Sequence, residues 1–93
     1  MNYKLKFKKE ALKEWEKLDE SLRIQFKKKL AERLKNPVVP ASRLSGKHNR
    51  FKIKLKNAGY RLVYEVRNSE LIVVVIAVGK REANRVYKAA STR

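Results

Sequence analysis

Residues 50–66 read RFKIKLKNAGYRLVYEV, and their pattern predicts the centre of the fold. Apolar and polar residues alternate from Arg50 to Lys56 and again from Tyr60 to Val66, with the period of two that is typical of a half-buried β-strand. Ala58-Gly59 between them predicts a tight turn. The wholly apolar run from Leu71 to Val78 then predicts a buried strand. Three consecutive strands therefore form the centre of the predicted structure.

The segments on either side complete an α+β fold. Residues 2–8 alternate, with Tyr3, Leu5 and Phe7 on one side and lysines on the other, so we predict a first strand there. Apolar residues at helical spacing then predict two amphipathic helices that join near Asp19 and contribute to the core. Their apolar positions are Leu12, Trp15 and Leu18 in the first helix, and Leu22, Phe26, Leu30 and Leu34 in the second.

Residues 37–49 have no steady period and predict a loop, and residues 82–90 predict a short, weak helix. The expected order is β-α-α-β-β-β-α in one small domain, residues 1–93. We expect a mainly antiparallel four-stranded sheet with both N-terminal helices on one face.

The register of the central hairpin predicts where the charges gather. A two-residue turn would pair Lys56 with Arg61, Lys54 with Val63 and Lys52 with Glu65. Val66 would face Leu71 in the next hairpin, so the last strand would return beside Arg61 and bring Gly79, Lys80 and Arg81 there. Like charges that meet on one face cost sheet stability, which favours a functional reason for this cluster. Val63, Ile72, Val74 and Ile76 would share the face, and if uncovered they would indicate a partner surface.

Composition supports a polyanionic partner. The chain has 25 Lys and Arg against 9 Asp and Glu, a formal net charge of +16 over 93 residues. It contains no cysteine and one histidine, His48, so we expect neither a zinc site nor another metal cofactor. The longest apolar run is too short to cross a bilayer. We expect a soluble cytoplasmic protein that needs no cofactor.

Several motifs resemble the bacterial RelE toxins of the RelE/ParE toxin–antitoxin superfamily. They are A-L-K-E-W-x-K-L from Ala11, K-K-K-L from Lys27, K-I-K-L from Lys52, G-Y-R-L-V-Y from Gly59, and V-G-K-R-E from Val78 with V-Y at Val86-Tyr87. The similarity extends over nearly the whole chain. The segment from Ser42 to Arg50 departs from the RelE pattern, so no contact of that loop is carried over.

The resemblance implies a ribosome-dependent endoribonuclease that cleaves mRNA in the ribosomal A site. Its implied residues of consequence are Lys52, Lys54, Arg61, Arg81 and Tyr87. The implied chemistry is attack of a ribose 2'-hydroxyl on its own 3'-phosphate without a metal, which leaves a 2',3'-cyclic phosphate and a 5'-hydroxyl. We also expect Lys56 and Lys80, which stand among these groups, to bind RNA or the ribosome.

The roles within this set are partly open. A free tyrosine is ionised to only about one part in a thousand at neutral pH, but neighbouring cations stabilise a phenolate. Either Tyr87 or one of Lys52 and Lys54 is therefore the expected base. Arg61 is expected to bind the scissile phosphate, and Arg81 to stabilise the leaving oxygen.

The resemblance also implies partners and leaves two alternatives. The partners are a RelB-like antitoxin, the small ribosomal subunit with its mRNA, operator DNA only through the toxin–antitoxin complex, and no membrane. The antitoxin would act by blocking ribosome entry or by moving the C-terminal helix with Tyr87. The alternatives are a ParE-like inhibitor of DNA gyrase and a basic nucleic-acid-binding module without catalysis.

Overall fold

The predicted elements are present, in the predicted order, in a computed structural model of the protein, which describes residues 2–46, 48–55 and 57–93. Strand β1 (Lys4–Phe7) precedes helices α1 (Lys9–Glu16) and α2 (Glu20–Lys35). The strands β2 (Arg50–Leu55), β3 (Tyr60–Arg67) and β4 (Ile72–Lys80) follow, and α3 (Arg85–Ser91) comes last. Short 3-10 turns occupy Pro40–Ser42 and Glu82–Asn84. Among the described residues, no helix is long and apolar enough to span a bilayer.

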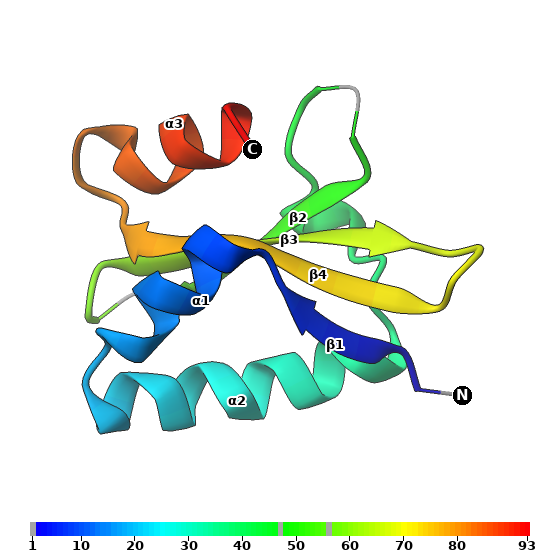
Figure 1. Ribbon diagram of the computed structural model, residues 1–93, viewed down its shortest axis with the longest axis horizontal. Coiled ribbons are helices and arrows are strands. Elements are labelled where there is room, and N and C mark those ends of the chain that lie inside the picture. The colour runs from blue at the N-terminus through cyan, green and yellow to red at the C-terminus, as the bar shows by residue number, and fades with distance from the viewer. Residues whose placement is uncertain (1, 47, 56) are drawn as a thin grey trace.

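The sheet has the order β1-β4-β3-β2. The pairs β2–β3 and β3–β4 are antiparallel, and β1 runs parallel to β4 at the edge of the sheet. Helices α1 and α2 lie on one side of the sheet and α3 on the other (Figure 1). The mainly antiparallel sheet with both N-terminal helices on one face is thus confirmed.

The larger core fills the space between the sheet and the two N-terminal helices. Phe26 and Leu30 of α2 pack there with Phe51, Ile53 and Tyr64 of the sheet. The prediction for Leu12 is wrong, because its side chain is 42% exposed. The apolar face of α1 instead carries Ala11 and Trp15, and Leu18, just after the helix, continues the same stripe at i, i+4, i+7 spacing.

The predicted register of both hairpins is wrong, although the predicted faces are right. The structure pairs Lys54 with Arg61, Lys52 with Val63 and Arg50 with Glu65, two residues away from the prediction. The reason is a longer turn: the last pair is Leu55–Tyr60, and the Gly59 N–H donates to the Leu55 carbonyl at 2.9 Å with Gly59 at φ +68°. A shift by two residues keeps every side chain on its face.

The second hairpin is shifted in a similar way. Val66 pairs with Val73 rather than Leu71, and a β-bulge between Val63 and Tyr64 moves the pairing by one further residue. The bulge brings Gly79 opposite Arg61. The end of β4 therefore returns beside Arg61, as predicted.

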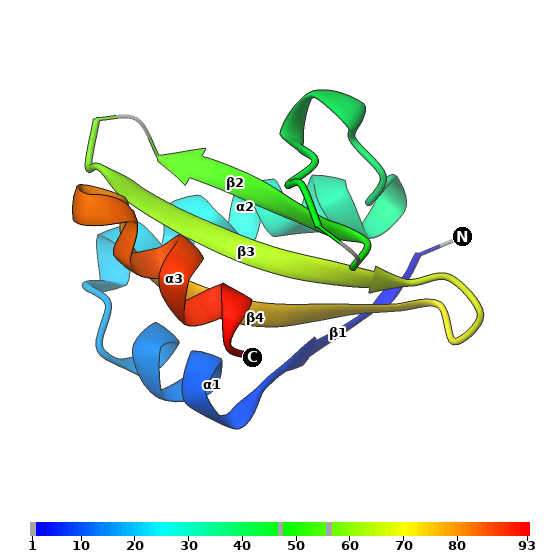
Figure 2. The same cartoon turned by 90° about the horizontal axis from the view of Figure 1, so that it is seen from above.

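The second face of the sheet is covered rather than open. Val63, Val74 and Ile76 are buried together with Val86 and Ala90 of α3. Figure 2 shows α3 lying across this face, over β3 and β4. The prediction that these valines and isoleucine are an uncovered partner surface is wrong, because the chain's own C-terminal helix occupies the face.

Candidate active site

The predicted cations meet in a pocket of about 620 Å³ between the end of the sheet and the start of α3. Its lining includes Lys52, Lys54, Arg61, Lys80, Arg81 and Tyr87. Lys56, the remaining predicted RNA-binding residue, lies outside the described residues. Residues from four separate segments of the chain thus form one concave surface with five cations.

Cross-strand pairing sets the spacing inside this pocket. Lys54 stands directly opposite Arg61, and Arg61 stands opposite Gly79 on its other side. The Arg81 N–H donates to the Gly59 carbonyl at 3.0 Å, which ties the end of β4 to the β2–β3 turn. Directly opposed like charges destabilise a sheet. Binding of an anion beside Lys54 and Arg61 would therefore be favourable.

Arg61 is the most enclosed cation of the pocket, with an exposed fraction of 7%. Its Nη1 donates to the Tyr60 carbonyl at 2.9 Å. Within the described part of the chain, no carboxylate lies within ion-pair distance of Arg61. A guanidinium has five N–H donors in a planar fork that matches a phosphate. Arg61 is thus well suited to bind an anion that enters the pocket.

Tyr87 reaches the pocket because the chain turns back after β4. The Asn84 N–H donates to the Arg81 carbonyl at 2.8 Å, and Asn84 adopts a left-handed backbone conformation with φ 57°. Asparagine tolerates this conformation better than most residues. Val86 and Ala90 then lie against the sheet, while Tyr87 lines the pocket.

Buried polar contacts hold the strand that carries the lysines. The Tyr64 hydroxyl donates to the Pro37 carbonyl at 2.7 Å and accepts from Arg33 Nη1 at 2.8 Å. Arg33 Nη1 also donates to the Lys52 carbonyl at 3.3 Å. Burial raises the pKa of Tyr64 against the smaller opposing effect of Arg33, so the hydroxyl stays protonated as a donor. This network fixes Lys52 relative to α2 and the loop that follows it.

Two groups of the pocket were not predicted as site residues. Glu82 contributes the single carboxylate of the described lining, and Asn84 lines the pocket beside Tyr87. Glu82 belongs to the V-G-K-R-E motif, so its position in that motif was the available signal. Asn84 gave no signal, because its role depends on the chain reversal.

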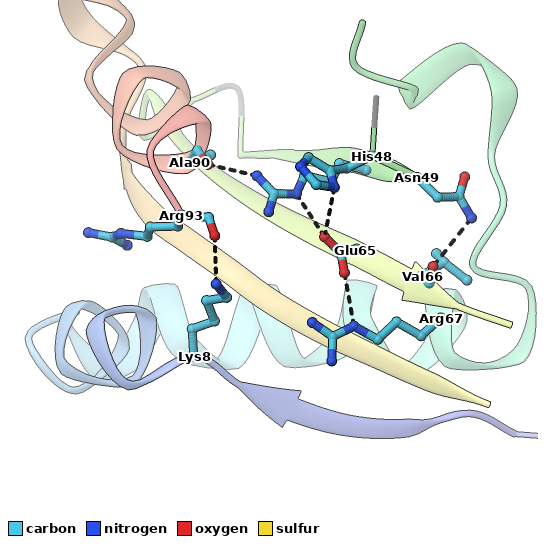
Figure 3. A network of polar contacts seen from close by, with 9 residues as sticks. Lys8, His48, Asn49, Glu65, Val66, Arg67, Ala90 and Arg93 are labelled. Atoms are coloured by element: carbon cyan, nitrogen blue, oxygen red, sulfur yellow. Dashed lines mark hydrogen bonds and ion pairs between the residues drawn. The ribbon is translucent and has the colours of Figure 1, made fainter. Parts of the chain in front are cut away.

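Charges are paired at the other end of the sheet face that α3 covers, away from the cationic pocket. Glu65 accepts a hydrogen bond from Arg50 Nε at 3.0 Å. It accepts another from Arg67 Nε at 2.9 Å, as Figure 3 shows. Burial alone would raise the pKa of Glu65, but the hydrogen bonds from Arg67 and Arg50 outweigh it, and the pKa is lowered. The sheet therefore pairs its charges where α3 ends and concentrates cations where α3 begins.

Glu65→Gln is expected to lower the free energy of unfolding at pH 7 by about 1–3 kcal/mol, because two charge-assisted hydrogen bonds are weakened. A lowered folded-state pKa contributes stability that is present above the ordinary value of 4.5 and is lost as the pH falls through the folded-state value. The difference between the two proteins should therefore shrink below about pH 4.5. Urea unfolding from pH 7 to pH 3 measures this, with Glu70→Gln, an exposed carboxylate, as the control. A difference that stays constant with pH would contradict the assignment.

Comparison with known proteins agrees with this architecture. The family model for the ParE toxin of the type II toxin–antitoxin system parDE matches residues 5–85. The mRNA interferase toxin RelE of Escherichia coli K12 is 50% identical over 93 residues, which cover 100% of this chain and 98% of RelE.

Solved structures of E. coli RelE also resemble this chain along most of its length. An Arg-to-Ala double mutant of E. coli toxin RelE in the free state superposes with a TM-score of 0.91 at 49% identity and covers 100% of this chain and 98% of that chain. The toxin in the intact E. coli RelBE toxin–antitoxin complex has a TM-score of 0.82 at 50% identity and covers 84% of this chain and 95% of that chain.

The fold and the cationic pocket thus define a small basic toxin of the type II toxin–antitoxin class. The chain belongs to the ParE toxin family of these systems and, within it, to the RelE toxins.

Proposed function

We propose that the protein is a ribosome-dependent mRNA interferase, the toxin of a type II toxin–antitoxin pair. The observation that carries this proposal is the pocket in which five cations and Tyr87 meet at the end of the sheet. Relatives that are 50% identical over the full length are named mRNA interferases. Because ribosomes are its target, the protein would act in the cytoplasm.

The proposed reaction is an internal transphosphorylation. A base removes the proton from a ribose 2'-hydroxyl, the 2'-oxygen forms a bond to the adjacent phosphorus, and the bond from phosphorus to the 5'-oxygen breaks. The products are a 2',3'-cyclic phosphate and a 5'-hydroxyl, which receives a proton. The residues must therefore supply a base, stabilise negative charge on the phosphorane, and assist the leaving oxygen.

The pocket contains groups suited to each requirement. We assign phosphate binding to Arg61, stabilisation of the leaving oxygen to Arg81, and the base to Tyr87 or to Lys52 or Lys54. Arg81 acts by its charge, since an arginine hardly releases a proton. Lys80, at the rim, would bind the RNA backbone.

The ribosome would supply what this shallow site lacks. Lys54, Lys80 and Arg81 are exposed, so the protein alone orients a flexible RNA poorly. Holding the reacting groups in a near-attack geometry contributes a large share of many rate enhancements. A codon held in the A site provides that orientation.

The antitoxin partner follows from the charge. An acidic, amphipathic segment of a RelB-like antitoxin would neutralise the cationic pocket and fold as it binds. The E. coli relative described above has been solved in the intact RelBE toxin–antitoxin complex, which supports a partner of this kind.

The test is primer extension on a defined mRNA held in ribosomes with an empty A site, with the protein and its Arg81→Ala variant. We expect a break inside the A-site codon with the parent, a loss of about 10²–10³-fold in the variant, and little cleavage of the same RNA without ribosomes. Intact mRNA with the parent, or equal cleavage of free RNA, would contradict the proposal.

Inhibition of DNA gyrase is a second candidate function, because the matching family model describes a ParE toxin and ParE-like toxins are the gyrase inhibitors considered above. A supercoiling assay with purified DNA gyrase separates the two activities. A module that only binds nucleic acid would give no product, and its affinity would fall with salt by a slope of about −0.7 for each phosphate contact on a single strand.

A further inference from the structure

Helix α3 has a small apolar contact with the sheet. It is seven residues long, and its buried side chains are Val86 and Ala90. A helix of this length has little stability by itself. Tyr87 and Ala89 pack only partly against the same cluster, so the apolar driving force for docking is modest. Other contacts must therefore help to hold α3, and Tyr87 with it, over the sheet.

Polar contacts gather at the C-terminal end of α3. Arg93 forms a bidentate pair with Glu14 of α1, with Nη1–Oε1 at 2.7 Å and Nη2–Oε2 at 3.2 Å. Lys8 Nζ donates to the main-chain oxygen of Arg93 at 2.6 Å (Figure 3). Arg50 Nη1 donates to the Ala90 carbonyl at 2.7 Å. These contacts join the end of α3 to the edge strand β2 through Arg50, and to α1 and the residue before it through Glu14 and Lys8.

The Glu14–Arg93 pair also completes the edge of β4. Strand β1 pairs with β4 only as far as Val75, so among the described residues no strand neighbours the β4 edge beyond that point. Glu14 Oε1 accepts from the Val78 N–H at 3.1 Å, and Arg93 Nη1 donates to the Ile76 carbonyl at 3.0 Å. The two side chains thus satisfy main-chain groups that another strand would otherwise satisfy. The pair is partly buried, with side chains 16% and 31% exposed for Arg93 and Glu14, so screening by solvent is reduced.

We propose that Glu14 and Arg93 are positioning residues for the cleavage reaction: they hold α3 docked and thereby keep Tyr87 in the cationic pocket. The consequence for cleavage rests on the proposed function, whereas the effect on docking does not. A small displacement of a catalytic group can cost a large factor in rate. The pair therefore influences the reaction although neither residue lines the pocket.

Docking can be measured without ribosomes. The chain has no cysteine, so Ala90→Cys introduces a single thiol at a position that is 3% exposed. Its reaction rate with a thiol reagent reports how often α3 leaves the sheet. In this background we expect Arg93→Ala and Glu14→Gln each to accelerate labelling by about three- to tenfold. Arg93→Lys, which keeps the charge but not the bidentate fork, should fall between them and the parent.

Two matched controls distinguish the loss of the Glu14–Arg93 contact from the loss of any single charge in the same region. Arg85→Ala removes an exposed arginine from the other end of α3, and Glu16→Gln removes an exposed carboxylate two residues from Glu14. Both should label at the parental rate. If the cysteine disturbs the fold, amide hydrogen exchange of residues 85–93 in the cysteine-free variants gives the same comparison. Unchanged labelling and exchange in Arg93→Ala and Glu14→Gln would overturn the proposal.

Cleavage then tests the connection to Tyr87. On ribosomes, Arg93→Ala should lower kcat by about three- to tenfold with KM nearly unchanged, and Arg93→Lys should restore part of the loss. In a Tyr87→Phe background Arg93→Ala should cause no further loss, because the pair acts through Tyr87. An equal loss in both backgrounds would overturn the role in positioning. If the Arg93→Ala and Glu14→Gln variants label faster but the parent cleaves no mRNA, the role of the Glu14–Arg93 pair in docking α3 is supported and only the proposed function is refuted.

Discussion

Arg61→Ala is expected to lower the single-turnover rate of mRNA cleavage on the ribosome by about 10²–10³-fold. Arg61 is the most enclosed of the pocket cations and stands between Lys54 and Gly79 in the sheet. Its charge acts where water is partly excluded, and electrostatic stabilisation of a transition state is strongest in such a place. The single-turnover rate is measured by mixing preformed ribosome complexes with excess protein and following mRNA cleavage over time.

Controls separate this effect from a change in folding. Arg67→Ala removes another arginine from the same strand and the same face, six residues away, and should keep cleavage near the parental rate. Arg61→Lys keeps the charge without the planar fork and should give an intermediate rate. Thermal unfolding of each variant is measured beside cleavage, because Ala also removes the buried stem of Arg61. Cleavage by Arg61→Ala at the parental rate would contradict the assignment of phosphate binding.

Tyr87→Phe is expected to lower the same rate by about 10²-fold or more, because it removes the hydroxyl but keeps the ring. Tyr87 lines the pocket together with Lys52 and Lys54, so a base at this position lies beside the cations that we propose to act on the phosphate. The single-turnover rates of the two proteins on ribosomes measure the loss.

A matched tyrosine is available as the control. Tyr60 precedes Arg61 on β3, but its side chain packs against the larger core on the other side of the sheet. Tyr60→Phe should therefore cleave at nearly the parental rate. If Tyr87→Phe also did so, the base would be Lys52 or Lys54, and Lys52→Ala and Lys54→Ala would then distinguish the two.

Local patterns predicted the elements well. Alternation predicted β2 and β3, and helical spacing predicted α1 and α2, because these patterns depend on the backbone geometry of each element alone. The turn chemistry was harder. Ala58-Gly59 suggested a two-residue turn, but the hairpin closes at Leu55–Tyr60, so Lys54 rather than Lys56 is opposite Arg61. The bulge between Val63 and Tyr64 had no signal in the alternation.

The location of the site followed from strand order and from the resemblance to RelE toxins together. The return of β4 beside Arg61 was predicted from the register of the second hairpin, and it holds despite the register error because the shifted pairing and the bulge bring Gly79 opposite Arg61. The pattern does not predict that α3 closes the pocket, since alternation alone leaves the apolar residues beneath α3 on an open face. A short, weak helix gives no sequence signal for the surface on which it docks.

The high positive charge, the alternating strands, the amphipathic helices and the residue types suited to act on RNA could all be read from the sequence. These are properties of composition and of neighbours along the chain. The three-dimensional fold was needed to show which cations oppose one another, which helix covers the second face of the sheet, and which ion pair joins α1 to the residues after α3. Glu14 and Arg93 are 79 residues apart in sequence, and they meet because the packing of α1 and α3 around β4 brings them together. Contacts of that kind depend on the free energy of the whole fold, and no local pattern records them.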